Sequence, residues 1–457
     1  MKIIFLIEAR QSYRYLSSLI EGALTDRHLV EVWHYCFSVK SIPIYKSPFF
    51  DKQINNLKFR AVRGIPDLES QISSCKEVDY FVSLNPVPFQ LTKDTYQKIN
   101  NKWCVIQHGI DSYATAWHWG LFDYDCDLLQ KYGRHYFSYT ESFHNLCVDW
   151  LKKYATPSEP YNYQFYTSSD TTPHEIGCTM GDFDSHDSAD LDKIRTKYGV
   201  PHNKKICIYL PFPFYPARAK YVRGGSYAWE SAFSGIFTSS EDNNPGQKKR
   251  LKSYFVNISR RLLYLSKVLC DKEARRWLFN RWNEPSVIKE VKRFCDANDL
   301  FLVVKPRKKF LSTKKVSIIA DLVIDDDELQ YHPSKLQEIF RISSISIGYQ
   351  STAVFESILY NVPFINIEMP KSFFNYEDAR IEIHSCRDGG IYNYKGVSYN
   401  VKIPELLNTL GDDPLAKYEI SSRARENYIR EYLINNNSAI PAREFLKVLC
   451  KHKIESD

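Results

Sequence analysis

Short apolar runs alternate with segments of helical periodicity along most of this chain. The first run is Lys2–Ile7, apolar residues recur at near-helical spacing in Ser12–Leu24, and β-type residues return in Val30–Phe37. Later runs of the strand type are Tyr80–Leu84, Trp103–Gln107 and His135–Tyr139. Alternation of this kind is typical of a parallel sheet with helices on both faces, so it predicts the α/β class.

A second series of the same kind begins near Lys204, after a looser polar region at about Thr156–Ser188. Its predicted strands are Ile206–Leu210, Phe301–Val304, Leu322–Ile324, Ser344–Ile347 and Phe364–Ile367. Two successive series predict two Rossmann-like, doubly wound domains that face an interdomain cleft. The last segment, Tyr418–Lys453, has a helical pattern. The expected units are a first domain at 1–200, a second at 201–425 and a helical segment at 426–457.

Composition excludes several classes of protein. With 44% hydrophobic and 25% charged residues among 457, the chain is neither disordered nor collagen-like. A formal net charge of +7 fits an anionic substrate or membrane surface and falls short of a dedicated nucleic-acid binder. No apolar run reaches the roughly 18 residues of a membrane span, and the run after Met1 is too short for a signal peptide. The 11 cysteines include no CxxC pair, which argues against a zinc ribbon and fits free thiols in the cytoplasm.

The densest chemical signal lies between Ile345 and Ile367, where the pattern is strand, tight loop, helix and strand. Gly348 allows a close turn, and Ser351 and Thr352 stand where the helix is expected to begin. Free amides and the positive end of a helix suit a phosphate or diphosphate. Glu356, one turn deeper, would accept hydrogen bonds from a ribose. The alternative is an ordinary N-cap, in which Ser351 or Thr352 caps the helix and Glu356 supports it.

A basic turn follows the predicted strand Phe301–Val304. Because ligands of open α/β sheets gather at the carboxyl ends of strands, Lys305 and Arg307 would face the same cleft as Ser351. Arginine is suited to bidentate contact with a phosphate. The alternative is a solvated basic turn. The segment Tyr331–Lys335 opens a short helix between these two signals, and His332 in it is placed to help cap that helix.

Polar residues also follow the apolar strand that begins at Trp103: Gln107, His108, Gly109 and Asp111. His108 is suited to act as a general base near neutral pH, and Asp111 would orient or replace it. Gly109 fits a turn at which the backbone comes close to a partner. The alternative for His108 is a hydrogen-bonded structural role. The end of the first strand places Glu8, Arg10 and Gln11 opposite the same cleft.

The order of these motifs resembles the C-terminal, nucleotide-binding half of GT-B fold glycosyltransferases. The chain is especially similar to bacterial surface-polysaccharide enzymes and to the related CDP-glycerol glycerophosphotransferases. The motifs are Lys305-Pro-Arg307, Tyr331-His-Pro333, Gly348-Tyr-Gln-Ser-Thr-Ala-x-x-Glu356 and Asn361-x-Pro363. The resemblance departs at Arg307, where the family usually has histidine. The donor-binding residues that it implies are Lys305, Arg307, His332, Gly348, Tyr349, Gln350, Ser351, Thr352 and Glu356, and Gln107-His-Gly109 looks like the His-Gly turn of the acceptor half.

The resemblance implies transfer of a sugar from a nucleotide-activated donor to a saccharide or lipid-linked acceptor in surface polysaccharide biosynthesis. It also implies that no metal and no cofactor is needed, so Lys305 and Arg307 would neutralise the leaving phosphate. The carboxylates of Asp325–Glu328 form a solvated loop in this interpretation, because consecutive side chains on a strand cannot all face one ion. Three alternatives stay open: a CDP-glycerol-type phosphotransferase, a UDP-sugar 2-epimerase and a non-catalytic sugar-binding assembly protein.

A basic and aromatic insertion at about 212–290 interrupts the second series. Lys248–Leu265 mixes basic and apolar residues at roughly helical spacing, and Arg275–Trp282 follows it. Such residues suit a helix that lies on anionic lipid, which would place a cytoplasmic enzyme peripherally at the inner face of a membrane. The alternative is a helical hairpin whose apolar side packs on the second domain.

Overall fold

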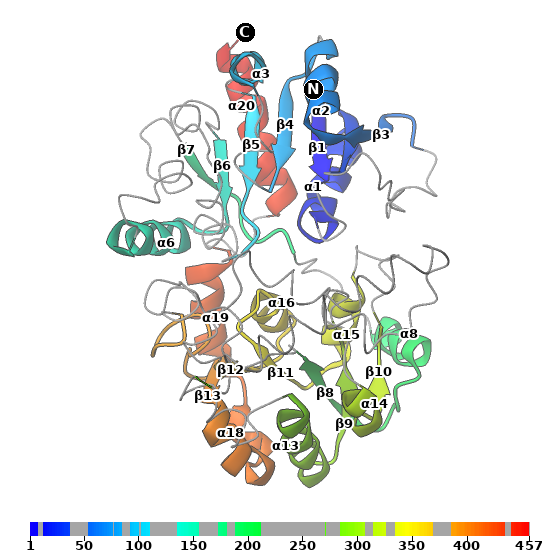
Figure 1. The fold of residues 1–457 in the computed structure, drawn as a ribbon, viewed down its shortest axis with the longest axis vertical. Helices are drawn as coiled ribbons and strands as arrows, with labels where there is room; N and C mark the ends of the chain where they lie inside the picture. Colours follow the sequence, from blue (N-terminus) through cyan, green and yellow to red (C-terminus); the bar gives the residue numbers. More distant parts are fainter. Residues whose placement is uncertain are drawn as a thin grey trace.

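A computed structural model describes residues 1–7, 12–36, 54–75, 77–84, 92–99, 102–109, 135–154, 172–180, 188–211, 270, 284–306, 314–325, 334–368, 385–434 and 440–456. These residues form two parallel sheets, of seven and six strands, that follow one another along the long axis of the molecule (Figure 1). The predicted α/β class with two doubly wound sheets is confirmed.

The first sheet has the strand order β3-β2-β1-β4-β5-β6-β7, and every neighbouring pair in it is parallel. Its strands are β1 (Lys2–Ile7), β2 (Leu29–Cys36), β3 (Leu57–Arg63), β4 (Tyr80–Ser83), β5 (Trp103–Ile106), β6 (His135–Ser138) and β7 (Thr172–Glu175). The helices among them are α1 (Tyr13–Thr25), α2 (Gly64–Ser74), α3 (Lys93–Ile99) and α6 (Glu141–Tyr154). The strand order reverses between β1 and β4, which is where ligands of doubly wound sheets bind.

The second sheet has the order β10-β9-β8-β11-β12-β13 and reverses between β8 and β11. Its strands are β8 (Lys205–Leu210), β9 (Leu300–Val304), β10 (Leu322–Val323), β11 (Ile345–Tyr349), β12 (Phe364–Glu368) and β13 (Ser398–Lys402). The helices are α8 (Ser188–Tyr198), α13 (Glu284–Ala297), α14 (Lys314–Ile319), α15 (Lys335–Ile342), α16 (Ala353–Leu359), α18 (Ile403–Thr409), α19 (Ser422–Tyr432) and α20 (Pro441–Ser456), with short 3-10 turns at η3 (Leu410–Asp412) and η4 (Leu415–Tyr418).

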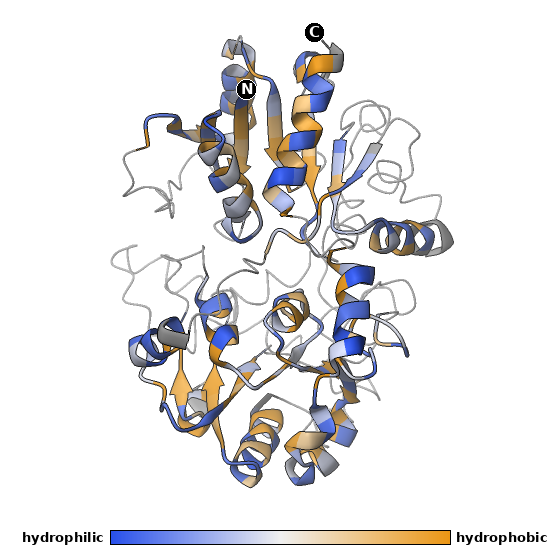
Figure 2. Cartoon of the chain, turned by 180° about the vertical axis from the view of Figure 1, so that it is seen from behind, coloured by the Kyte–Doolittle hydropathy of each residue, from blue (hydrophilic) through white to orange (hydrophobic). Residues whose placement is uncertain are grey.

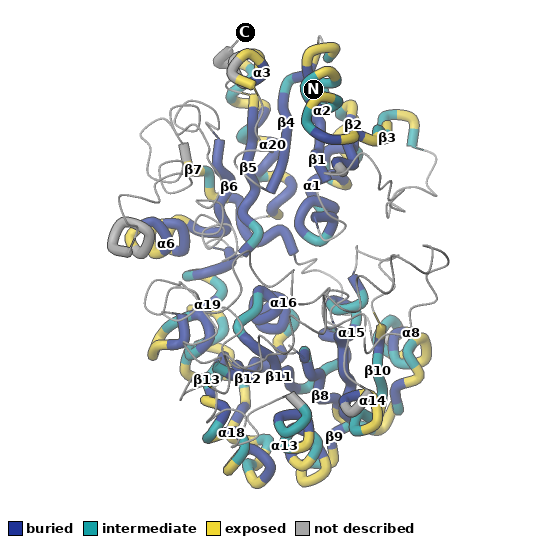
Figure 3. Tube along the Cα trace, in the orientation of Figure 1, coloured by how far each residue is buried: buried dark blue, intermediate teal, exposed yellow. Residues whose placement is uncertain are grey.

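The apolar strands form these sheets because they bury both of their faces. In β8, Ile206 and Ile208 join the core with α8 and α15, whereas Cys207 and Tyr209 join the core with α13 and α18. Side chains alternate between faces with a period of two, so one continuous apolar run supplies both cores. Hydrophobic strands and mixed helices are visible in Figure 2, and the buried strands contrast with the exposed outer faces of helices in Figure 3.

The predicted strands are found, but three further strands, β3, β7 and β13, are missing from the prediction. All three are edge strands. An edge strand has a neighbour on one side only and needs fewer apolar residues. β3 reads Leu-Lys-Phe-Arg-Ala-Val-Arg and is largely half-buried or exposed, and β7 lies inside the polar region at Thr156–Ser188.

The end of the chain differs from the predicted single helix over Tyr418–Lys453. Two separate helices are present: α19 packs beside α6 and α16, and α20 returns to the first sheet and packs on α1 (Figure 1). A Cβ on Gly22 of α1 would lie 2.6 Å from the Cβ of Ala442, so glycine permits this close helix packing. The Tyr80 hydroxyl also donates to the Leu449 carbonyl at 2.9 Å. The chain therefore ends on the domain in which it begins.

Helix α8 also lies in a different core from the one expected. The boundary at 200 placed it in the first domain, but Ile194 and Val200 belong to the core of the second sheet, and α8 packs on α15. The predicted interfacial segment within 212–290 lies outside the described residues, except for Cys270 and the start of α13. Among the helices that the structure describes, none is both long and apolar enough to cross a membrane.

Candidate functional site

The two sheets meet where the turn after β5 contacts the start of α16. Gly109 in this turn has φ +79°, and a Cβ there would overlap the methyl group of Thr352 and lie 3.2 Å from its Cβ. Positive φ and close approach both require glycine. The backbone at Gly109 does come close to another group, which is Thr352 of the same chain, and the approach of an acceptor to this turn stays a prediction. The segments that follow β5 and β11 are therefore in direct contact.

Helix α1 lines the same junction. The ring of Tyr15 lies edge-on to that of His108, with centroids 5.9 Å apart, and its hydroxyl is 3.5 Å from the Thr352 hydroxyl. His108 is half-buried, whereas Tyr15 and Thr352 are buried. The predicted general base and the predicted donor loop therefore share one side chain, Tyr15, as a common neighbour.

A buried ion pair crosses the junction beside these residues. The Nε of Arg14 in α1 donates to Oε1 of Glu356 at 2.8 Å, and its Nη2 pairs with Oε2. The Glu356 side chain is fully buried, and that of Arg14 is 17% exposed. A buried carboxylate is tolerated only with such a partner. Sequence reasoning placed Glu356 at the donor ribose and missed Arg14, although an arginine between two tyrosines after the first strand was a visible signal.

Helix α16 is held from both domains. All seven of its residues are buried. Phe355 lies edge-on to Tyr139 and Phe143 of the first domain, at centroid distances of 6.1 and 5.7 Å. At its other end, Arg425 of α19 donates to the carbonyls of Ile358 and Leu359 at 2.8 and 2.7 Å. These contacts fix the position of Glu356 relative to the first sheet.

The start of α16 fits the predicted position, but the ordinary-cap interpretation accounts for only part of it. Thr352 precedes the helix and makes no side-chain cap bond. The hydroxyl of Ser351 accepts from the amide of Ala353 at 3.3 Å. Glu356 pairs with Arg14 instead of supporting a cap. Only Ser351 therefore has a capping contact, and Thr352 and Glu356 face the first domain.

The remaining donor-side residues surround the ends of β9 and β11. Lys305 is buried directly after β9, and its Nζ donates to the Pro306 carbonyl at 3.3 Å. The Tyr349 hydroxyl lies 3.3 Å from that of Tyr209, and Gln350 donates to the sulfur of Cys386 at 3.3 Å. These residues thus lie at the carboxyl edge of the second sheet, as expected.

Two predicted residues have a structural role that the prediction did not give them. Gly348 lies inside β11 and forms no turn; a Cβ there would lie 3.1 Å from Leu210 and 3.3 Å from Phe364, so glycine leaves room for these two side chains of the neighbouring strands. Gln107 is fully buried: its Oε1 accepts from the Tyr139 amide at 2.7 Å, and its Nε2 donates to the Gly109 carbonyl at 3.5 Å. Gln107 therefore supports the turn rather than presenting its amide to an acceptor.

The other predicted site residues lie outside the described part of the chain, and their roles stay predictions. They are Glu8, Arg10, Gln11, Asp111, Arg307 and His332.

No family model matches the sequence, and no curated protein matches it. Among solved structures, a variant of the wall teichoic acid polymerase TagF aligns with 100% of this chain and 89% of its own, at a TM-score of 0.50 and 13% identity. A TagF variant soaked with CDPG aligns with the same TM-score of 0.50, at 12% identity over 100% and 90% of the two chains. The chain has the GT-B fold.

HepE of Anabaena, in complex with UDP and glucose, also aligns, at 10% identity over 98% of this chain and 99% of its own, with a TM-score of 0.48. All of these identities are far below the level at which activity transfers with fold. GT-B folds carry different reactions, so function has to be argued from the residues at the junction.

Proposed function

We propose that this protein is a glycosyltransferase that moves a sugar from a nucleotide-activated donor to a saccharide or lipid-linked acceptor in surface polysaccharide biosynthesis. One observation carries the proposal: the turn that bears His108 contacts the loop that precedes α16, at Gly109 and Thr352. A group-transfer enzyme needs its base and its donor site within reach of one reacting centre. The GT-B fold supports the same assignment.

In the proposed reaction, the donor's phosphates bind near Lys305 and the Ser351–Thr352 loop. The acceptor hydroxyl attacks the anomeric carbon, and the bond from that carbon to the phosphate oxygen breaks, so the nucleotide leaves with the electron pair. His108 takes the acceptor proton, with Asp111 as the predicted alternative. Positive charge at Lys305, and at Arg307 as predicted, stabilises the leaving phosphate, so that neither a bound metal nor a cofactor is required.

The ion pair between Arg14 and Glu356 adds a condition to donor binding. The Glu356 side chain is fully buried and its two oxygens face Arg14, so ribose hydroxyls can reach the carboxylate only if the contact between α1 and α16 opens. We therefore expect Glu356→Gln to weaken nucleotide binding by about tenfold to a hundredfold, because a hydrogen bond to a charged group contributes about 1.5–3 kcal/mol. Calorimetry with UDP and CDP measures this change.

The first test is a thermal-stability screen with UDP, CDP, GDP, CMP and their sugar derivatives, because a ligand that binds the native state raises its stability by mass action. The stabilising donor is then incubated with saccharide acceptors, and products are weighed by mass spectrometry. We expect a glycosylated acceptor and a free nucleotide. A protein that none of these ligands stabilises, and that transfers no sugar, contradicts the proposal.

A CDP-glycerol-type phosphotransferase is the second candidate, favoured by the alignment with TagF soaked with CDPG. It would use the same donor residues but transfer a phosphoalcohol and release CMP. A CMP-activated sugar also releases CMP, so the mass gained by the acceptor decides between the two.

We also propose that the enzyme docks on anionic lipid at the inner face of a membrane. Sedimentation with anionic vesicles at low and high salt tests this docking.

A further inference from the structure

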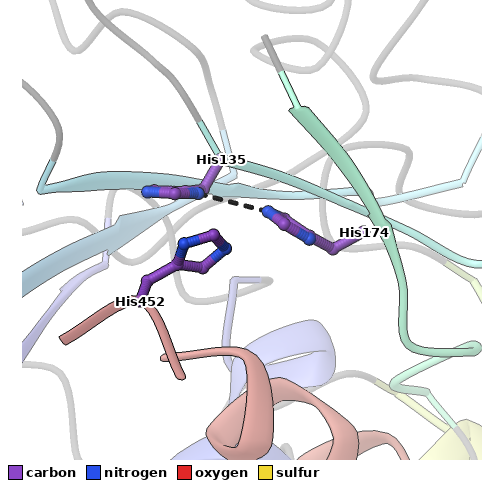
Figure 4. Close-up of side chains that lie close together, drawn as sticks. All are labelled: His135, His174 and His452. Atoms are coloured by element: carbon purple, nitrogen blue, oxygen red, sulfur yellow. Dashed lines mark hydrogen bonds between the residues drawn. The ribbon is translucent and has the colours of Figure 1, made fainter. Parts of the chain in front are cut away.

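Three histidines from distant parts of the chain converge at the amino end of β6. His135 is the first residue of β6, His174 lies in β7, and His452 lies in α20 (Figure 4). One ring nitrogen of each lies within 4.8 Å of the other two. The Nδ1 of His135 and the Nε2 of His174 are 3.2 Å apart. In Figure 4 the ring of His452 lies against both other rings.

The nitrogens of His135 and His174 are spaced like two ligands of one tetrahedral ion, and the ring of His452 lies at a comparable centroid distance from both. Zinc binds imidazole nitrogen at about 2.0–2.1 Å, which puts two nitrogen ligands about 3.3 Å apart and their ring centroids roughly 5 Å apart. The observed distance between the two nitrogens is 3.2 Å. The centroid distances are 5.4 Å between His135 and His174, 4.6 Å between His135 and His452, and 5.1 Å between His174 and His452.

We propose that His135, His174 and His452 bind one Zn²⁺ ion, with water as the fourth ligand. Imidazole nitrogen is a ligand that zinc prefers, whereas Mg²⁺ and Ca²⁺ prefer oxygen, so the site discriminates against these two ions. His135 is 8% exposed, and the other two are half-buried, so an ion can enter while one position stays open to water.

Three histidines and a water form an open coordination sphere of the kind that catalytic zinc sites have, but the cluster lies away from the candidate active site, so we assign the ion to holding α20 and not to the transfer reaction. The candidate active site follows the carboxyl end of β5. His135 lies at the amino end of β6, which is where the strands of the same sheet begin and is opposite to the end that bears the site. The ion fastens α20 to β6 and β7, next to the ion pair between Lys453 and Asp79 at 2.9 Å. It thereby ties the end of the chain to the first domain.

The test uses the untagged full chain, first stripped with a chelator. Equilibrium dialysis against ZnCl₂, with elemental analysis, is expected to give one tightly bound ion per chain, and MgCl₂ is expected to give none. Cobalt in place of zinc is expected to show the intense visible absorption of a four-coordinate ion. His452→Gln and His174→Gln should each weaken zinc binding at least tenfold. His202→Gln is the matched control, because His202 is an exposed histidine remote from the cluster and pairs with Asp192 at 3.0 Å.

Circular dichroism of His452→Gln checks that the variant folds; His452 is half-buried on the last helix, so its loss leaves the sheets intact. Zinc should raise the melting temperature of the wild type and of His202→Gln, but not that of His452→Gln. Wild type that binds no stoichiometric zinc overturns the proposal. So does an affinity that His452→Gln and His174→Gln leave at the wild-type level, because the histidines would then be only a hydrogen-bonded cluster.

Discussion

Helices α16 and α20 both contact the first domain, but the two contacts differ in kind. The contact of α16 contains a buried ion pair, Arg14 with Glu356, and a turn that only glycine fits at Gly109. The contact of α20 with α1 is apolar around Ala442 and Leu449, and its charges lie at the surface. A buried charge that loses its partner is costly, whereas a surface pair contributes little. Loss of a single charge is therefore expected to cost more at the Arg14–Glu356 pair of the α16 contact than at the Lys453–Asp79 pair of the α20 contact.

The largest expected effect is on turnover at the α16 contact. His108→Ala should lower kcat by about 10²–10⁴-fold, because a positioned base contributes that much to the rate. Nucleotide affinity should change little. His28→Ala is the matched control: His28 is also partly buried but precedes β2, at the amino end of the first sheet. Equal loss of nucleotide affinity and turnover in His108→Ala would instead assign the turn to the donor site.

The next largest effect is on stability. Arg14→Met leaves Glu356 buried without its partner, so the free energy of unfolding should fall by about 3–5 kcal/mol. The double variant Arg14→Met/Glu356→Met removes both charges and should regain most of that loss. Urea unfolding measures all of these variants. A double variant as unstable as Arg14→Met would show that packing, not charge, dominates the contact.

A smaller loss of stability is expected at Gly109, where the cost of close contact can be separated from the cost of backbone strain. Gly109→Ala should cost about 1–3 kcal/mol, since the new Cβ meets Thr352 and the backbone has positive φ. Gly199→Ala is the control, because Gly199 has φ +68° and a Cβ added there would meet no atom within 4 Å, so it reports strain alone. Thr352→Ser removes the methyl group and should restore part of the stability of Gly109→Ala. Thermal unfolding of the wild type, Gly109→Ala, Gly199→Ala and Gly109→Ala/Thr352→Ser measures the loss of stability in each variant.

The smallest effect is expected at the Lys453–Asp79 pair of the α20 contact. Burial raises the pKa of Asp79, but the hydrogen bonds from Lys453 and the Lys2 amide outweigh it and hold that pKa below its ordinary value of 3.8. This stabilisation is therefore present above pH 3.8 and is lost as pH falls through the lower native pKa. Lys453→Met should cost less than about 1 kcal/mol at pH 7, because both side chains are partly exposed.

That difference should shrink as the pH falls below the native pKa of Asp79, where the carboxylate is protonated in both proteins. Urea unfolding of the wild type and of Lys453→Met at pH 7 and at a series of lower pH values measures it. A loss comparable to that of Arg14→Met would remove the contrast between the two helices.

Local patterns predicted the central strands and the α/β class, because a strand buried on both faces has to be apolar throughout. They also predicted that the polar residues after β9 and β11 lie at the same end of the second sheet, since parallel strands end on the same side, and that those after β5 lie opposite them across the cleft. Gly109 was predictable from its place near the end of a buried strand, because a glycine there indicates a turn with positive φ or close approach.

Tertiary structure alone decided the partners of these residues. Arg14 pairs with Glu356, although most of the chain lies between them. His452 likewise meets His135 and His174, which precede it by several hundred residues. No local period links such residues, because their distance depends on how two sheets and a returning helix pack. The edge strands β3, β7 and β13 follow the same principle: pairing with an existing sheet, rather than their own apolar content, makes them strands. The sequence thus determined which segments are buried, and packing determined which charges and rings meet.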